Sequence, residues 1–260
     1  MSGAEIILLD QVDSTNTYAR TNFNDLPDGA VVFAAEQTAG RGRLGRNWVS
    51  SRDQAIMASA VFKNIEQPFH AGIIVGLAGL ELVRECAPQA FSFLKWPNDI
   101  YIDDCKVAGI LSEGVLGQGR LQGVVSGIGI NINNPMAELR QNNIRAVALC
   151  EISDRQFFLE KLRFELAKKI KKYYIMCQSH LDSMIALWKQ ENRLIGETLV
   201  VDMPSGERRQ GIFFDLADTG EMLMRGKNGG EFRFDCGDVK IDTALIDFKS
   251  LKTKYNNKTK

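Results

Sequence analysis

The densest group of chemically capable side chains is the run Gly40–Arg46, which holds three glycines and three arginines in seven residues. Arginine presents planar, permanently charged donors that match the oxygens of a phosphate or carboxylate two at a time. Glycine lets the backbone adopt positive φ and lets a ligand approach closely. The apolar run at 30–35 predicts a strand leading into this loop. We therefore expect the loop to wrap a small anion, with the rest of the chain supplying the other walls.

Two further groups follow the loop. Lys95-Trp96-Pro97-Asn98-Asp99 interrupts a predicted strand, and Lys106 begins the next one. By local pattern alone Lys106 is best read as a solvated turn residue, but the small apolar residues after it would also suit a pocket that pairs the charge. In Gly127-Ile128-Gly129-Ile130-Asn131, glycines inside a strand mark either a bulge or the close approach of a ligand or of the backbone. Both interpretations stay open from the pattern.

Several familiar sites are excluded or disfavoured. Gly40, Gly42 and Gly45 match the dinucleotide fingerprint, but that fingerprint must open a helix, and residues 47–49 have no helical pattern. Kinase, Walker A and GxSxG signatures are absent from the sequence. The three arginines could contact nucleic-acid phosphates, although a formal net charge of zero disfavours a nucleic-acid-binding protein.

Hydrophobic periodicity predicts the elements that must position these groups. Helices are expected at 14–20, with Asp13 or Ser14 as its cap, and at 69–86, 153–176 and 181–191. Four lysines near the end of the third helix are expected to form a solvated face. Strands are expected at 5–9, 30–35, 55–62, 91–94, 100–102, 106–113 and 121–132. Two hairpin-like connections make part of the sheet antiparallel.

Beyond residue 193 the pattern changes to short strands separated by turns such as Pro204-Ser205-Gly206, which fits a small barrel of about five strands. The predicted fold is therefore α+β, with a mixed β-sheet backed by helices and a small C-terminal SH3-like β-barrel. We expect a catalytic domain at 1–193, the barrel at 194–248 and a disordered tail at 249–260.

The composition is that of an ordinary globular protein, with 45% hydrophobic and 25% charged residues among 260. No run approaches the roughly 20 apolar residues of a membrane helix, and the start lacks a secretory signal. Only two histidines occur, and no CxxC pair is present. The five cysteines are Cys86, Cys105, Cys150, Cys177 and Cys236. We expect reduced thiols, a cytoplasmic location and no structural zinc.

Read together, the three groups resemble the biotin protein ligases. GRGRLGR, KWPND with KVAG starting eight residues after its asparagine, and GIGIN occur in the family's order and at its intervals. The resemblance runs from Asp13-Ser14-Thr15-Asn16 to Gly237-Asp238. With no helix-turn-helix before Asp13, the monofunctional type without a DNA-binding domain is expected. The segment 50–55 lacks the usual Pro-x-Gly, which leaves the return of the loop undefined.

The resemblance implies an enzyme that joins the biotin carboxylate to the α-phosphate of ATP and then passes the biotinyl group to a lysine of a biotin carboxyl carrier domain. Two anions must meet, and their repulsion at 4 Å is about 4 kcal/mol at an effective dielectric near 20. Lys106 and Arg43 are the implied catalytic cations. The implied biotin-binding residues are Ser14, Thr15, Asn16, Gln37, Gly40, Arg41, Arg43, Lys106 and Gly109. The implied ATP- and adenylate-binding residues are Arg41, Arg43, Arg46, Trp48, Asn98, Gly129 and Asn131.

Mg²⁺ is expected to arrive with ATP; its protein ligands are not identified by the sequence, and Asp99 is the one candidate. A monomer or homodimer is expected, with no DNA or membrane partner. The alternatives are a lipoate or octanoate ligase or transferase of the same fold and a non-catalytic nucleic-acid-binding module.

Overall fold

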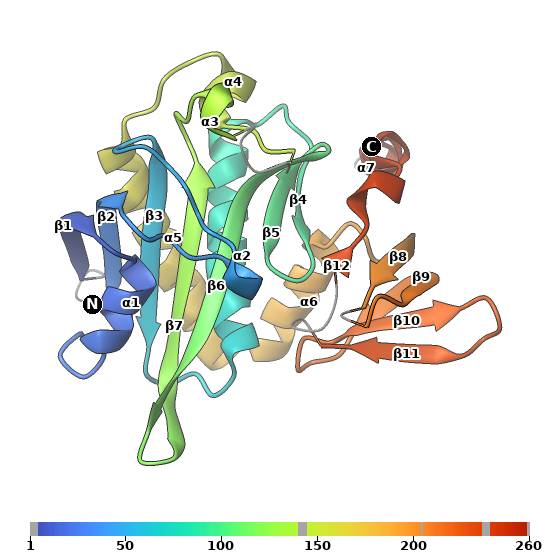
Figure 1. Ribbon diagram of the computed structural model, residues 1–260, viewed down its shortest axis with the longest axis horizontal. Coiled ribbons are helices and arrows are strands. Elements are labelled where there is room, and N and C mark those ends of the chain that lie inside the picture. The colour runs from blue at the N-terminus through green and yellow to red at the C-terminus, as the bar shows by residue number, and fades with distance from the viewer. Residues whose placement is uncertain (1–4, 140–144, 204, 236–239, 259–260) are drawn as a thin grey trace.

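The computed structural model describes residues 5–139, 145–203, 205–235 and 240–258. Its centre is a seven-stranded sheet in the order β1-β2-β3-β7-β6-β5-β4 (Figure 1). Strands β1 and β2 pair in parallel, whereas every other neighbouring pair is antiparallel. The strands are β1 Ile6–Val12, β2 Val31–Gln37, β3 Ala55–Phe62, β4 Ser92–Lys95, β5 Asp99–Ile102, β6 Cys105–Gly117 and β7 Arg120–Asn131. The predicted mixed sheet is confirmed.

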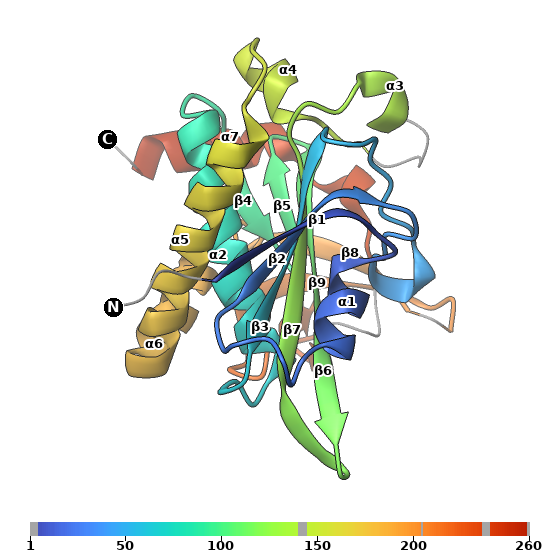
Figure 2. The same cartoon turned by 90° about the vertical axis from the view of Figure 1, so that its left-hand side faces the viewer.

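Helices cover the two faces of this sheet unequally (Figure 2). On one face, α2 (Pro68–Cys86) packs against β6 and β7, α5 (Leu159–Ser179) lies beside it against β3, and α6 (Leu181–Glu191) contacts β4. A Cβ on Gly79 of α2 would lie 2.6 Å from Cδ1 of Ile128, so the glycine permits close packing of helix on sheet. The short α1 (Thr15–Thr21) takes part of the other face and leaves the rest open for a ligand.

The long third helix begins later than predicted. A short helix, α4 (Leu149–Ser153), ends at Asp154, which adopts the left-handed conformation with φ 48°. The amide of Asn133 then holds the backbone of Phe157, accepting from its N–H at 3.1 Å and donating to its carbonyl at 2.9 Å. These two bonds keep the chain extended until α5 starts at Leu159, so the predicted start at 153 is wrong.

A second, five-stranded antiparallel sheet follows, in the order β11-β10-β9-β8-β12. Its strands are β8 Thr198–Asp202, β9 Arg208–Leu216, β10 Met222–Gly226, β11 Glu231–Phe234 and β12 Lys240–Ile241. Phe213 and Met222 belong to the same hydrophobic cluster as the main sheet, and Trp96 donates its Nε1–H to the carbonyl of Gly220 at 2.8 Å. Pro204, Cys236 and Gly237-Asp238 lie outside the described residues.

Where the sequence predicted a disordered tail at 249–260, the described residues 248–258 form helix α7 (Phe248–Lys258). The Phe248 ring stacks on Tyr101 at 6.1 Å between centroids and 6° between planes. Leu251 is buried, and Lys252 Nζ lies 2.8 Å from Asp103 Oδ1. These contacts anchor a segment whose lysine-rich composition alone suggested solvation. In the described ranges no helix has the length and apolarity to cross a membrane.

Candidate active site

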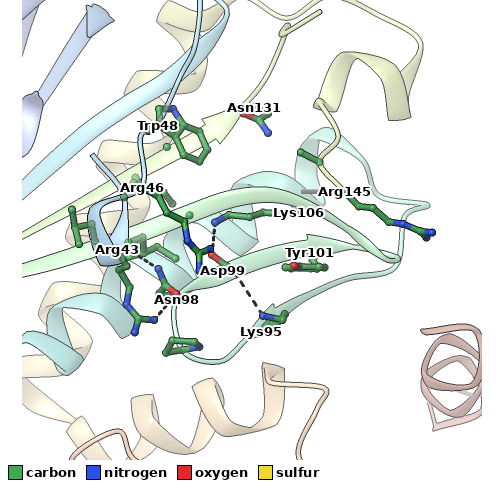
Figure 3. A pocket seen from close by; sticks show the side chains of 18 of the residues that line it. Arg43, Arg46, Trp48, Lys95, Asn98, Asp99, Tyr101, Lys106, Asn131 and Arg145 are labelled. Atoms are coloured by element: carbon green, nitrogen blue, oxygen red, sulfur yellow. Dashed lines mark hydrogen bonds and ion pairs between the residues drawn. The ribbon is translucent and has the colours of Figure 1, made fainter. Parts of the chain in front are cut away.

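A cavity of about 1270 Å³ lies on the open face of the main sheet, between the glycine-arginine loop, the β4–β5 hairpin and strands β6 and β7 (Figure 3). It collects the predicted side chains from segments far apart in the sequence. Its lining includes Ser14, Thr15, Asn16, Gln37, Arg41, Arg43, Arg46, Trp48, Asn98, Lys106, Gly109, Gly129 and Asn131. Gly40 is the one predicted site residue that does not line it.

The glycine-arginine loop folds back on itself. The amide of Gly42 donates to the carbonyl of Arg46 at 2.7 Å, and a 3₁₀ turn spans Arg43–Gly45. Leu44 and Gly45 both have left-handed φ values, 56° and 70°. Gly40 serves the loop by close approach, because a Cβ there would lie 2.4 Å from the carbonyl oxygen of Trp48.

The three arginines of the loop have different surroundings. Arg41 forms an ion pair at 2.9 Å with Glu113, a carboxylate that it shares with Arg20. Arg43 donates to the side-chain oxygen of Asn98 at 3.0 Å, a neutral partner that leaves its charge uncompensated. Arg46 makes no side-chain hydrogen bond or ion pair within the described ranges, and Figure 3 shows it reaching toward Asp99. Arg43 and Arg46 are therefore the loop cations available to an anionic ligand.

The KWPND segment holds a buried group of charges beneath the loop. Asp99 Oδ1 lies 2.6 Å from Lys106 Nζ, and Asp99 Oδ2 lies 3.8 Å from Lys95 Nζ. Burial alone would raise the pKa of Asp99, but Lys106 and Lys95 hold it below its usual value. Burial lowers the pKa of Lys95 despite the opposing charge of Asp99. Two lysines thus share one carboxylate, and the cluster keeps an excess of positive charge.

Asn98 is the link between this cluster and the loop. Its side-chain amide donates to the carbonyl of Ile110 at 2.6 Å, and its backbone carbonyl accepts from the Ile110 amide at 2.8 Å. These bonds to β6 fix the orientation of the amide so that its oxygen faces Arg43. Asn131 is also held by the backbone, donating to the carbonyl of Val147 at 3.3 Å.

The opposite end of the cavity is lined mainly by uncharged polar side chains that are densely hydrogen-bonded. Gln37 Oε1 accepts from the amide of Thr15 at 2.7 Å and from its hydroxyl at 3.0 Å. Asn16 donates to the carboxylate of Glu113 at 2.8 Å, and its oxygen lies 2.6 Å from Ser59 Oγ. The Ser14 hydroxyl makes no capping bond to α1 although the residue is the N-cap, so it is free to face the cavity.

Ser59 and Glu113 do not line the cavity but hold Thr15, Asn16 and Arg41, which do, and the sequence reasoning missed both. Ser59 is fully buried in an otherwise apolar strand, and Glu113 receives Arg20, Arg41 and Asn16 together. A serine in a run of small and apolar residues gives no signal by itself. The one indication in the sequence is that Ser59 is polar at a position whose side chain, by strand alternation, faces the cavity side of the sheet.

The glycines of β6 and β7 leave space for the Trp48 side chain. A Cβ on Gly129 would lie 2.4 Å from Trp48 Cε2, and a Cβ on Gly109 would lie 3.5 Å from Cζ3 of the same ring and 2.9 Å from Lys106 Nζ. The indole therefore lies flat over the strands, and its buried Nε1 has no hydrogen-bond partner among the described residues. The space above these strand glycines is filled by the protein's own Trp48 side chain, and not by a ligand or the backbone.

One end of the cavity has uncharged hydrogen-bonding groups and the other end has cations. Such a cavity suits a ligand whose polar head group binds at the first end and whose other end meets a polyanion at the second. Comparison with known proteins agrees. The Biotin/lipoate A/B protein ligase family model matches residues 8–131. The biotin--[acetyl-CoA-carboxylase] ligase of Mycobacterium tuberculosis is 31% identical over 226 residues, which cover 82% of this chain and 80% of the relative. This chain belongs to the biotin protein ligase family.

Two further comparisons support membership across most of the chain. The biotin--[acetyl-CoA-carboxylase] ligase of Paracoccus denitrificans is 29% identical and covers 85% of this chain and 95% of its own length. The structure of the biotin protein ligase from Aquifex aeolicus in complex with biotin and ATP superposes with a TM-score of 0.75 at 25% identity, covering 91% of this chain and 98% of the other.

Proposed function

We propose that this chain is an ATP-dependent ligase that activates biotin as biotinyl-5'-AMP and transfers the biotinyl group to a lysine of a biotin carboxyl carrier domain. The observation that carries the proposal is the convergence of Arg43, Arg46 and Lys106 on one cavity that also holds the neutral polar set. The Aquifex relative, crystallised with biotin and ATP, supports the same pair of substrates.

In the first step a carboxylate oxygen of biotin attacks the α-phosphorus, and the bond to the departing pyrophosphate breaks. Lys106 and Arg43 offset the repulsion between the two anions, which is about 4 kcal/mol at contact distance. Asp99 keeps Lys106 in position through the 2.6 Å ion pair. Because these cations are fixed before the substrates react, little reorganisation is needed as charge develops. No side chain has to form a covalent intermediate.

The neutral end supports recognition of the ureido ring, which has two N–H donors and one carbonyl acceptor. Gln37 has its oxygen committed to Thr15, which leaves its Nε2–H group to donate to the ring carbonyl. The Ser14 hydroxyl is available to the ring in the same way. Asn16 is engaged by Ser59, Glu113 and Leu111, so we assign it a positioning role and not a direct contact.

Mg²⁺ enters this proposal with its substrate ATP. The described residues contain no group of three or more His, Cys, Asp or Glu side chains that could hold a metal ion. Asp99, the candidate from sequence, already faces Lys106 and Lys95 with its two oxygens. Cationic side chains and not a preformed carboxylate site would therefore meet the metal-bound phosphates.

The remaining assignments are also proposals. We infer a catalytic domain at 1–193 and an SH3-like barrel at 194–248, supported by the five-stranded antiparallel sheet of the second region. A cytoplasmic location is supported by the four described cysteines, all of which are free thiols. The acceptor would be the carrier domain of an acetyl-CoA carboxylase, the enzyme named in both curated relatives.

The test is ATP–pyrophosphate exchange driven by biotin, with lipoate and octanoate in parallel and a carrier domain added in a second assay. Biotin alone should support exchange, and the carrier domain should gain the biotinyl group. Exchange with lipoate or octanoate and not with biotin would assign the chain to the sister activity. A folded protein that exchanges with none of the three acids would contradict adenylation altogether.

A further inference from the structure

The C-terminal segment forms a wall of the cavity, although it follows the second sheet in sequence. Thr243, Ala244, Ile246, Phe248, Lys249 and Lys252 all line the same space as Lys106 and Arg46. Figure 1 shows α7, in red, lying apart from the second sheet, beyond β12. The chain therefore completes its substrate cavity with its last described helix.

Two anchors fix the start of α7 against the catalytic hairpin. Phe248 stacks on Tyr101, whose ring also lies 5.3 Å from the ammonium of Lys95. One turn later, Lys252 pairs with Asp103 at 2.8 Å. Lys249 follows Phe248 directly, so its backbone is held on the same wall as the lysine-rich end of the cavity.

The wall carries charges of both signs, since the carboxylate of Asp247 also lines the cavity and accepts from the Ser250 amide at 3.0 Å. Arg145 forms an ion pair with Asp104 and Lys252 forms one with Asp103, so these cations are compensated by the protein. Lys249 lines the cavity, is exposed, and has no hydrogen bond or ion pair from its ammonium to any described residue. Lys249 and Arg46 line the same cavity as the Lys95–Asp99–Lys106 cluster, in which two lysines share one carboxylate. One biotin carboxylate cannot match that much charge, whereas a polyphosphate can.

We propose that Lys249 binds the β- and γ-phosphates of MgATP, and hence the pyrophosphate product, from the C-terminal helix. This rests on the proposed ligase function for its substrate, but the phosphate contact can be measured without turnover. Phe248 acts as the positioning residue, since its stack on Tyr101 sets where the Lys249 side chain begins.

The experiment compares wild type, Lys249→Ala, Lys249→Arg and Lys254→Ala. Lys254 is the matched control, because it lies on the same helix, carries the same charge and pairs with Glu197 away from the cavity. In biotin-dependent exchange, Lys249→Ala should raise the KM for MgATP and for pyrophosphate about tenfold and leave the KM for biotin unchanged. Lys249→Arg should retain most of the affinity, and Lys254→Ala should match wild type.

Calorimetric titration of magnesium pyrophosphate into the same four proteins separates this proposal from the proposed function. Weaker binding by Lys249→Ala alone supports the contact even in a protein that shows no exchange. Equal pyrophosphate affinity for wild type and Lys249→Ala overturns the assignment, and it does so even if wild type is an active biotin ligase. An equal loss in Lys254→Ala would also overturn it, because general charge and not the cavity contact would then explain the effect.

Discussion

The chain holds two clusters in which lysines meet carboxylates, and they differ in their balance. At the α2–α5 interface, Lys169 contacts Glu81 at 3.2 Å and Glu85 at 2.6 Å, and Lys172 contacts Glu81 at 2.7 Å. Two lysines there meet two carboxylates. In the cavity, Lys95 and Lys106 share Asp99 alone.

The balance between lysines and carboxylates indicates whether a cluster stabilises the fold or binds an anionic ligand. In a balanced cluster, the attraction between opposite charges offsets the free-energy cost of removing them from water, and the cluster holds two helices together. An unbalanced buried cluster raises the free energy of the empty protein, and an anionic ligand removes that cost. Lys169 also corrects the sequence-based expectation of a solvated face, since it is only 7% exposed, whereas Lys168 and Lys172 are exposed as expected.

The largest effect should come from removing the cavity cation closest to the proposed reaction. Lys106→Ala should lower the kcat/KM of biotin-dependent exchange by about 10²–10³, because one preorganised donor typically contributes about 3–4 kcal/mol to the transition state. Steady-state exchange kinetics measure this. Lys168→Ala removes an exposed lysine of α5 that pairs with Glu165 and should match wild type. A Lys106→Ala enzyme as active as the control would contradict the role of the cavity cluster in the reaction.

The balanced cluster should respond in stability and not in activity. Burial alone would raise the pKa of Glu81, but hydrogen bonds from Lys172, Tyr173 and Lys169 lower it to about 2. A lowered pKa stabilises the fold above the ordinary value of 4.5, and that contribution is lost as the pH falls from 4.5 through 2. Glu81→Gln should therefore lose about 2 kcal/mol of unfolding free energy at pH 7, after discounting for partial exposure.

Urea unfolding across pH 7 to pH 2 checks this result for Glu81→Gln. The difference from wild type should narrow once the pH falls below 4.5, while exchange activity at pH 7 stays at the wild-type value. A constant difference at every pH would mean that packing, and not ionisation, carries the effect.

The third and smallest predicted effect concerns the carboxylates. One carboxylate is removed from each cluster and the exchange kinetics are compared. Asp99→Asn should lower exchange kcat/KM about tenfold, because Lys106 loses the ion pair that positions it. The matched change Glu85→Gln removes a partner of Lys169 and should leave exchange kinetics unaltered. Comparable losses in both variants would show that the cavity carboxylate has no special role.

Local hydrophobic and turn patterns predicted the sheet and most helices, whereas the meeting of the three motifs was predicted only by the resemblance to the biotin protein ligases. The sequence could not predict contacts made across long separations. Asn16 bonds to Ser59, 43 residues away, and to Glu113, 97 residues away. The start of α5 was missed because the Asn133–Phe157 bonds override helical periodicity. The order of α7 depends on Phe248 finding Tyr101, which composition cannot reveal.

The hydrogen bond from Trp96 to the carbonyl of Gly220 also bears on how the chain is made. Gly220 has a positive φ of 95°, and a Cβ there would lie 2.4 Å from the ring of Phe69, so the β9–β10 turn presses directly on the main core. Synthesis proceeds from the N-terminus, so more than a hundred further residues are added after Trp96 before its partner, Gly220, is made. During translation the Nε1–H of Trp96 therefore lacks the carbonyl partner that the second sheet later supplies.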